Sequence, residues 1–294
     1  MNKHAAVAVV GGDARQAILA ELMDQDGHTV SVGALERHSF NKHEHIRSIA
    51  DLKTGLSEHN IIILPMPVQK GENQLNAPLS NASHLIGDLL DCIAPGTLVL
   101  AGAVPFAVHA RAVRNHLRLT DYLTRDELAV RNAVPTAEGA IQIAMEQTDV
   151  TLHGLPVLVI GCGRIGSVLS AKLAAIGAKV TVSARSCGDH ARIEAAGLSA
   201  ADTRRLSDVL GGFSLVFNTV PAAVLGAAEL AKLPADALVI DLASQPGGID
   251  LAAVPPAGIR IIHALSLPGK VAPVTASIAV RDTIYAILGE EGIL

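Results

Sequence analysis

The sequence predicts an α/β fold with two mainly parallel sheets, because one pattern of elements occurs twice along the chain. In each half a short apolar run ends at glycine, and a helical pattern and a second strand follow it. The first strands, residues 5–10 and 157–160, are apolar throughout, as expected of strands that are buried on both faces. The repeat indicates two Rossmann-like domains, residues 1–134 and 135–294, with a cleft between them.

Three glycines after the strand at 157–160 have the spacing of a dinucleotide-binding turn. Gly161, Gly163 and Gly166 form G-x-G-x-x-G between a strand and a helix. The first permits the tight turn, the second lets the backbone approach a pyrophosphate, and the third lets helix and strand pack closely. Arg164 and Ile165 begin a helix whose N–H groups and positive dipole end favour phosphate. A purely structural turn is the alternative, but the surrounding order of elements favours a dinucleotide.

The end of the next strand, within residues 179–185, indicates which dinucleotide binds. NAD sites place Asp or Glu there to hold the ribose 2′-hydroxyl, whereas Arg accommodates the 2′-phosphate of NADP. Here Ser183, Arg185 and Ser186 occupy the strand end, and the first acid is Asp189. A guanidinium binds phosphate through two parallel hydrogen bonds, and serines add neutral donors. The sequence predicts NADP rather than NAD; the alternative is that Arg185 is an exposed residue that opens a helix.

Composition narrows the class of protein. The 294 residues suffice for two domains, and an aromatic content of 2% argues against the stacking platforms that bind single-stranded nucleic acid. A net charge of −5 without a basic stripe argues against nucleic acid and anionic membranes as partners. No apolar run approaches the roughly 20 residues that span a bilayer, and the N-terminus leads directly into a strand without a signal peptide. We therefore expect a cytoplasmic protein.

No metal site is expected. Cys92, Cys162 and Cys187 are odd in number and far apart, which fits neither a zinc site nor a disulfide framework. The histidines of the polar stretch 38–45 lack a second ligand group at a suitable spacing, so a solvated loop is the favoured interpretation.

The turn after the first strand differs from the dinucleotide turn. Residues 11–15, Gly-Gly-Asp-Ala-Arg, lack the glycine triplet and place Asp13 and Arg15 where a phosphate would lie. Two interpretations stay open here, a site for a small anionic substrate and a contact between the domains.

Residues 123–139 are rich in hydrogen-bonding groups. Pro135 is predicted to open a helix that runs to about Thr148 and crosses from the first domain to the second. Glu138 would then lie in the first turn of this helix, facing the cleft in which two-domain dehydrogenases hold substrate. A role as a helix-stabilising acid is the alternative for Glu138. A last helix within residues 275–294 is expected to pack back across the cleft onto the first domain.

Two later strand ends are predicted to contact the nicotinamide end of the cofactor, since ligands of open α/β sheets bind outside the carboxyl ends of strands. The first ends in Asn218-Thr219-Val220-Pro221 and the second in Asp241-Leu242-Ala243. Asp241 is equally a candidate for a buried turn acid that accepts hydrogen bonds from backbone N–H groups. His263, near a further strand end, is either an acid–base residue or a packing residue.

A set of motifs extends over nearly the whole chain. They are, in order, Gly11-Gly12-Asp13-Ala14-Arg15, Ile63-Leu64-Pro65, Pro135-Thr136-Ala137-Glu138-Gly139, Thr148-Asp149 with His153-Gly154, Gly161 to Gly166, Ala184-Arg185-Ser186, Asp241 to Gly248 and Leu267 to Pro273. Together they resemble the A subunit of bacterial dipicolinate synthase. The resemblance implies an NADP-linked oxidation of dihydrodipicolinate to dipicolinate, the chelator of the spore core. It also implies that the partner is a flavoprotein-like B subunit, and that the location is the mother cell during sporulation.

The implied reaction moves a hydride from a dihydropyridine dicarboxylate to nicotinamide C4 and a proton to a base, and the ring becomes aromatic. The protein then needs mainly to align the ring and to hold two carboxylates. Arg15 and Arg125 are the candidate carboxylate ligands, because Arg binds carboxylates through two hydrogen bonds. Asn132 and Thr136 are candidates for additional neutral donors.

Asp126 or Glu138 is the candidate base, although water could serve for so acidic a ring proton. A homo-oligomer is also expected. Two other functions stay open. A dehydrogenase of the alanine or shikimate type shares two nucleotide-like domains, but no Lys–Asp pair is evident in the region 135–138. An NADP-binding regulatory or scaffold protein, whose partner does the chemistry, would carry the same turns.

Overall fold

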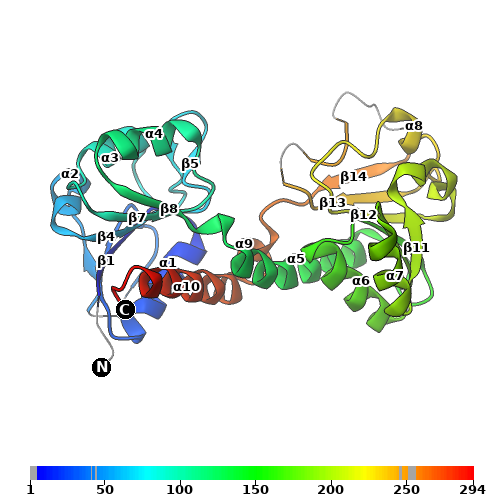
Figure 1. The fold of residues 1–294 in the computed structure, drawn as a ribbon, viewed down its shortest axis with the longest axis horizontal. Coiled ribbons are helices and arrows are strands. Elements are labelled where there is room, and N and C mark those ends of the chain that lie inside the picture. Colours follow the sequence, from blue (N-terminus) through cyan, green and yellow to red (C-terminus); the bar gives the residue numbers. More distant parts are fainter. Residues whose placement is uncertain (1–4, 41, 44, 245–246, 251–255) are drawn as a thin grey trace. The chain divides into compact units, whose positions relative to one another are not determined.

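The computed structural model describes residues 5–40, 42–43, 45–244, 247–250 and 256–294. The chain forms two compact units, of which unit 1 is Met1–Arg131 with Ala272–Leu294 and unit 2 is Asn132–Val271. Each unit is built around its own six-stranded sheet, as the repeat in the sequence predicts (Figure 1).

The sheet of unit 1 has the strand order β3-β2-β1-β4-β7-β8, and its neighbouring strands are parallel. This is the strand order of the dinucleotide-binding fold. The strands are β1 (Ala6–Val10), β2 (Thr29–Gly33), β3 (Arg47–Ser48), β4 (Ile61–Ile63), β7 (Leu98–Ala101) and β8 (Arg118–Asp121). A small antiparallel hairpin of β5 (Gln69–Lys70) and β6 (Gln74–Leu75) follows β4.

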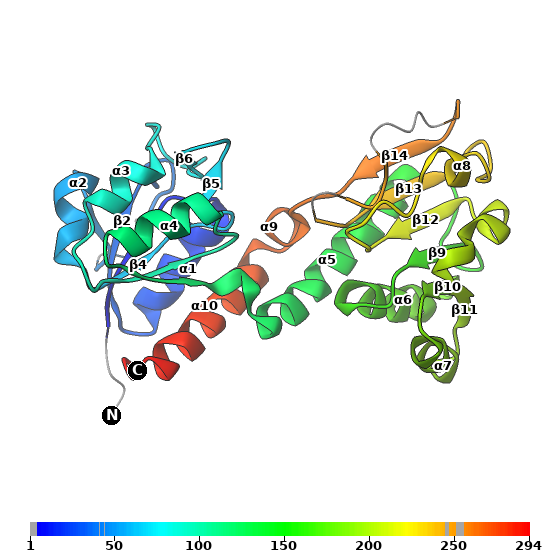
Figure 2. The same ribbon diagram turned by 45° about the horizontal axis from the view of Figure 1, so that its top comes forward.

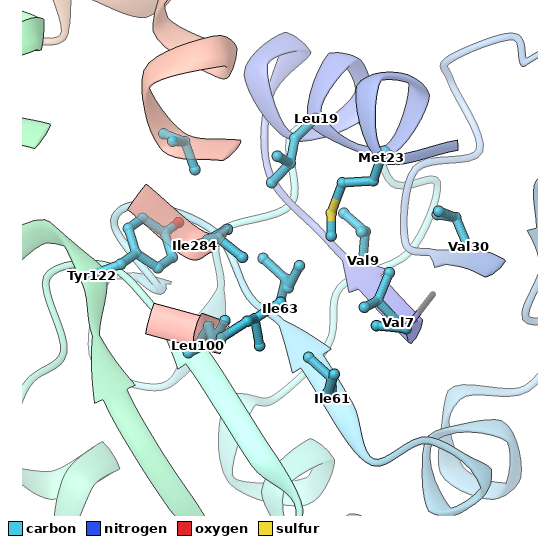
Figure 3. Packing of buried hydrophobic residues seen from close by; sticks show 14 of the residues in the cluster. Val7, Val9, Leu19, Met23, Val30, Ile61, Ile63, Leu100, Tyr122 and Ile284 are labelled. Carbon is cyan, nitrogen blue, oxygen red and sulfur yellow. The ribbon is translucent and has the colours of Figure 1, made fainter. Parts of the chain in front are cut away.

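Helices cover both faces of this sheet, so the side chains of β1 point alternately into two cores. Val7 and Val9 pack in one core, which Figure 3 shows beneath Leu19 and Met23. Ala8 and Val10 pack in the other. The helical segments of unit 1 are α1 (Ala14–Gln25), α2 (Leu52–Gly55), η1 (Leu56–Glu58), α3 (Ile86–Asp91), α4 (Phe106–Arg114), η2 (Tyr122–Thr124), the start of α5 (Asp126–Gln147) and α10 (Pro273–Glu290).

The last helix, α10, packs within unit 1 against α1 (Figures 1 and 2). Its buried side chains pack in the core that α1 and β1 form, among them Val280, Ile284 and Leu288. The Ser277 hydroxyl donates to the backbone carbonyl of Arg15 at 2.8 Å. This helix was predicted to belong to the second domain and to contact the first. Its apolar face instead makes it a structural part of unit 1.

Unit 2 repeats the architecture with the strand order β11-β10-β9-β12-β13-β14, again with parallel neighbours. Its strands are β9 (Pro156–Ile160), β10 (Lys179–Ala184), β11 (Ser199–Asp202), β12 (Leu215–Asn218), β13 (Leu238–Asp241) and β14 (Arg260–His263). Its helical segments are α6 (Arg164–Ile176), α7 (Cys187–Ala195), η3 (Thr203–Asp208), η4 (Leu210–Gly212), α8 (Ala227–Leu230) and α9 (Leu267–Val271). The helices α6 and α7 share one core, and η3, η4 and α8 share the other.

The helix predicted to start at Pro135 starts nine residues earlier in the chain, at Asp126, and this start corrects the prediction. Asp126 and Glu127 lie in its first turn, where acids are favoured by the helix dipole. Pro135 lies inside the helix, although it supplies no N–H for a helical bond. Next to the proline, the Thr136 hydroxyl donates to the backbone carbonyl of Asn132 at 2.7 Å, so this carbonyl has a hydrogen-bond donor. Glu138 therefore lies in the middle of α5 rather than in its first turn.

Candidate dinucleotide-binding site

The candidate site lies at the carboxyl ends of the strands of unit 2. The strand order reverses at β9, because β10 and β11 lie on one side of it and β12 to β14 on the other. In open α/β sheets the crevice at this reversal, outside the carboxyl ends of the strands, is where ligands bind. The loops that follow β9 and β12 meet there, since Thr219 N–H donates to the Ile160 carbonyl at 2.9 Å.

The glycine turn after β9 needs its glycines for different reasons. Gly161 has φ +100°, and a Cβ on it would lie 2.9 Å from Val220 Cγ2. A Cβ on Gly166 would overlap the carbonyl oxygen of Gly161, so this glycine lets α6 pack on the turn. A Cβ on Gly163 would meet no described protein atom within 4 Å, so space is open beside that glycine. The tight turn at Gly161 and the close packing at Gly166 agree with the spacing, while the approach of a pyrophosphate to Gly163 stays a prediction.

The N-terminus of α6 suits a phosphate. Gly163 is the N-cap and has no side chain to bond the first N–H groups of the helix. Those groups need acceptors, and a phosphate oxygen supplies them together with a charge that the helix dipole favours. Arg164 and Ile165 occupy this first turn. The geometry therefore fits the pyrophosphate of a dinucleotide.

A pocket of about 620 Å³ extends along these strand ends, a volume suited to a large ligand. Most of the predicted cofactor residues line it, namely Gly161, Gly163, Arg164, Ile165, Ser183, Arg185, Ser186, Thr219, Val220, Pro221, Leu242 and Ala243. Its wall also contains residues that were not predicted to contact the cofactor, among them Cys162, Asp189, Thr203, Ala222, Val224 and Ser244. Thr203 directly follows β11, a strand that was not predicted from the sequence.

Three predicted cofactor residues, Gly166, Asn218 and Asp241, lie behind the pocket wall. Asn218 and Asp241 are both buried, and Asn218 Nδ2 donates to Asp241 Oδ1 at 2.8 Å and to the Val220 carbonyl at 3.0 Å. Asp241 also accepts from the backbone N–H groups of Ala243 at 3.2 Å and Gly248 at 3.1 Å. The geometry of Asp241 is thus that of a buried turn acid, which holds in place the loops that line the pocket.

His263 lies beside this buried carboxylate. Its Nδ1 is 3.4 Å from Asp241 Oδ2, and the side chain is 47% exposed. The register pairs Asp241 with His263 on adjacent strands, so the histidine is at the same carboxyl edge as the pocket.

The end of the pocket beside β10 and α7 is polar. The Ser186 hydroxyl donates to Asp189 at 2.7 Å and accepts from the Asp189 N–H at 3.0 Å, which caps α7. The hydrogen bond from Ser186, followed by the ion pair with Arg192, holds the pKa of Asp189 below its usual value. Arg185 lines the pocket and is exposed. Asp189, in the first turn of α7, is the first acid after the end of β10.

The turn after β1 in unit 1 holds a small pocket of about 10 Å³, lined by Gly12, Asp13 and Arg15 among others. The Arg15 side chain is 11% exposed and pairs with Asp13, with Nη2 at 2.8 Å from Oδ2. Its Nη2 also donates to the Met66 carbonyl at 3.1 Å. Among the described residues, none accepts a hydrogen bond from Nη1 of Arg15. The pocket beside this guanidinium is about large enough for one water molecule, so binding of a carboxylate at Nη1 would require the pocket to widen.

Arg125 is placed differently from a substrate ligand, and the prediction for it is corrected here. Its Nη1 and Nη2 each donate to Glu290 at 2.7 Å, and its Nε donates to Glu127 at 2.7 Å. These hydrogen bonds, first from Glu290 and then from Glu127, raise the pKa of Arg125. Two carboxylates of the chain occupy the guanidinium, so its role is to tie the end of α10 to the start of α5.

The other predicted substrate and acid–base residues all lie on α5. Asn132 Oδ1 is buried and has no hydrogen-bond partner among the described residues, whereas the Thr136 hydroxyl is used within the helix. Asp126 is exposed in the first turn. Glu138 is 55% exposed and forms an ion pair with Lys172 Nζ at 2.9 Å. Both carboxylates are thus exposed to solvent.

Two histidines of the polar stretch 38–45 make hydrogen bonds within unit 1. Residues 41 and 44 of this stretch are outside the described residues. His38 Nε2 lies 2.9 Å from Glu21 and His43 Nδ1 lies 3.0 Å from Asp24. Across the described residues, no group of three or more His, Cys, Asp or Glu side chains is arranged to hold a metal ion. In the same part of the chain, no helix has the length and apolar character needed to cross a membrane.

The fold and the pocket define a dinucleotide-binding protein of the dehydrogenase class. Residues 123–247 match the NAD-binding domain of D-isomer-specific 2-hydroxyacid dehydrogenases, so unit 2 contains an NAD(P)-binding domain. Residues 6–123 match the N-terminal domain of the dipicolinate synthase A subunit.

The chain is 33% identical to the dipicolinate synthase A subunit of Bacillus subtilis (strain 168), with 97% of this chain and 96% of that protein covered. It therefore belongs to the family of dipicolinate synthase A subunits, and the resemblance noted in the sequence is confirmed. The crystal structure of the A subunit from Bacillus halodurans is similar with a TM-score of 0.90 at 30% identity, covering 98% of this chain and 99% of that one. That of the dipicolinate synthase A chain from Bacillus subtilis gives 0.87 at 30% identity, covering 99% and 97%.

Proposed function

We propose that this protein catalyses the NADP-linked oxidation of dihydrodipicolinate to dipicolinate during sporulation. The observation that carries the proposal is the pocket of unit 2, which joins a glycine turn to a strand end bearing Arg185. Membership of the dipicolinate synthase family over nearly the full chain supports the substrate. The proposed reaction is an oxidation of a ring that already carries two carboxylates.

The residues present fit NADP. Gly161, Gly163 and the first turn of α6 would hold the pyrophosphate, and Arg185 with Ser186 would meet the 2′-phosphate. The loops that follow Asn218 and Asp241 would flank the nicotinamide ribose. When bound, NADP supplies an acceptor for the hydride at nicotinamide C4. The residues of this chain would bind the substrate and align its ring with the cofactor.

Arg15 is our proposed ligand for a substrate carboxylate. Asp13 and the Met66 carbonyl hold the guanidinium in place, while Nη1 faces no acceptor among the described residues. A charge-assisted hydrogen bond from Nη1 to a carboxylate needs little rearrangement of such a side chain. Asn132 is a further candidate, because its buried Oδ1 has no partner in the described part of the chain.

The proton that leaves the ring is proposed to pass to water. Glu138 is already paired with Lys172, and Asp126 is exposed at the start of α5. A positioned general base contributes roughly 10²–10⁴-fold to a rate. Because formation of the aromatic ring drives loss of this proton, we expect Asp126→Asn and Glu138→Gln to lower kcat by less than about threefold each. A loss of about a hundredfold in either variant would identify that carboxylate as the base.

The relatives are named as one of at least two kinds of subunit, so a partner follows from that name. We propose that this partner is a flavoprotein-like B subunit and that the location is the cytoplasm of the mother cell. Assembly of this chain with a second copy of itself is proposed as well.

The test is an assay of the purified chain with freshly prepared dihydrodipicolinate and either NADP or NAD. We expect formation of NADPH together with dipicolinate, in equal amounts and with no partner protein present. If the chain binds the cofactor but turns over only when the B subunit is added, a regulatory or scaffold role replaces the proposed one.

A further inference from the structure

The ends of β10 and β11 bring a second arginine beside the predicted 2′-phosphate site. The two strands are parallel neighbours, and Ala184 pairs with Asp202 at their carboxyl ends. Arg185 directly follows β10, and Arg204 lies two residues after the end of β11. Thr203 lines the pocket together with Arg185, so the second loop reaches the same ligand space.

Arg204 is fastened to the loop that carries Arg185. Its Nη2 donates to the backbone carbonyl of Arg185 at 2.8 Å, and its Nε donates to Asp202 Oδ1 at 3.1 Å. Asp202 Oδ1 also accepts from the Arg204 N–H at 2.9 Å. The Arg204 side chain remains 67% exposed, and its Nη1 has no acceptor among the described residues. The guanidinium is thus both fixed in position and accessible.

The pocket edge that carries Arg185 also carries a carboxylate, that of Asp189. Asp189 lines the same pocket, and its hydrogen bond from Ser186 and its pairing with Arg192 keep its pKa low, so it is ionised at neutral pH. A carboxylate this close opposes a phosphate that carries nearly two negative charges. A second guanidinium offsets that repulsion.

We propose that Arg204 is a specificity-determining residue for the 2′-phosphate of NADP, acting together with Arg185. The inference rests on the proposed function in unit 2, and it adds a residue that the sequence spacing does not single out. Arg204 fixes the backbone of Arg185 through one side of its guanidinium and contributes its charge through the other.

The competing explanation is that Arg204 only holds the loop. Arg204→Gln removes the charge, and its shorter side chain keeps a donor only near the position of Nε, beside Asp202. The comparison of ligands separates the two roles, because a disturbed loop weakens 5′-AMP and 2′,5′-ADP alike, whereas loss of the charge weakens 2′,5′-ADP alone. The adjacent Arg205 gives a matched control, since it is 75% exposed and pairs with Asp208 through Nη2 at 2.7 Å. Arg205→Ala removes the same charge one residue away without touching the loop of Arg185.

The experiment is calorimetric titration of the full-length protein with 2′,5′-ADP and with 5′-AMP, in the wild type and in Arg185→Ala, Arg204→Ala, Arg204→Gln and Arg205→Ala. The ratio of the two dissociation constants isolates the contribution of the 2′-phosphate. We expect Arg204→Ala and Arg204→Gln to lower the preference for 2′,5′-ADP about five- to tenfold, as for loss of one charge-assisted hydrogen bond. Binding of 5′-AMP should change by less than about twofold, and Arg205→Ala should match the wild type.

The inference is overturned if Arg204→Gln keeps the wild-type preference, or if both ligands weaken equally. If Arg185→Ala abolishes the preference at the same time, the NADP assignment stands and only the role of Arg204 fails. If the wild type binds 5′-AMP as tightly as 2′,5′-ADP, the NADP assignment fails as well.

Discussion

Gly163 and Gly166 differ in what surrounds the position of a side chain, and this difference separates folding from binding. Gly163 has φ −83°, an ordinary value, and open space beside it, so alanine should be accepted by the fold. Its methyl group would occupy space that we assign to a pyrophosphate. We expect Gly163→Ala to unfold at the wild-type temperature to within about 1 °C and to bind NADPH at least about tenfold more weakly.

Gly166→Ala is the contrasting variant, since its Cβ would overlap the Gly161 carbonyl. The turn must shift, and overpacking of this kind costs about 1–3 kcal/mol. The denaturant midpoint should therefore fall in this variant alone. Equal loss of stability in both variants would contradict the separate roles.

Arg15 and Arg125 were equivalent candidates in the sequence, but the structure distinguishes them by their partners. Arg15 has one edge of its guanidinium without an acceptor in the described residues, whereas Glu127 and Glu290 occupy Arg125. We expect Arg15→Ala to raise KM for dihydrodipicolinate roughly tenfold or more with little change in kcat, the pattern for loss of ground-state binding. Arg125→Ala serves as the control and should leave KM unchanged. An unchanged KM in Arg15→Ala would remove Arg15 from the substrate site.

At the scale of elements, the ion pair between Arg125 and Glu290 joins the residue just before α5 to the last turn of α10 within unit 1. The hydrogen bond from Arg125 lowers the pKa of Glu290 from its ordinary 4.5. A carboxyl with a lowered pKa in the folded state stabilises the protein above its unfolded pKa, and this contribution is lost as pH falls through the folded pKa.

Glu290→Gln should therefore lower Tm at pH 7 by only about 1–2 °C, since the 59% exposure of Glu290 leaves the pair screened by solvent. Thermal melting of both proteins at decreasing pH should show the difference shrinking below pH 4.5. A difference that is constant with pH would mean that packing of the side chain, and not its charge, holds α10.

At the scale of the molecule, the pattern of apolar runs and glycines was sufficient to predict two parallel sheets and the turn at Gly161. Those features depend on local periodicity and on spacing within one strand–turn–helix unit. The start of α5 was missed because Pro135 usually opens a helix, while here the acids at 126–127 open it and the proline lies inside. The acids at 126–127 and Pro135 are both common at the start of a helix, so the sequence alone did not decide between the two starts.

Other features depend on residues that are far apart in sequence. Arg125 meets Glu290 across 165 positions, and the register of β10 and β11 brings Arg204 to Arg185. Asp241 is buried because Asn218 and the N–H of Gly248 satisfy it, which the residue types alone left undecided. Spacing along the chain contains no information on such pairings, so only the folded structure identifies them.

The most direct test of the central claim is titration of the purified protein with NADPH and NADH, followed by nicotinamide fluorescence. We predict tight binding of NADPH and weak binding of NADH, with the NADPH affinity lost in Arg185→Asp. Equal affinity for both cofactors in the wild type, unchanged in Arg185→Asp, would show that Arg185 is only a surface residue and would contradict the assignment of NADP.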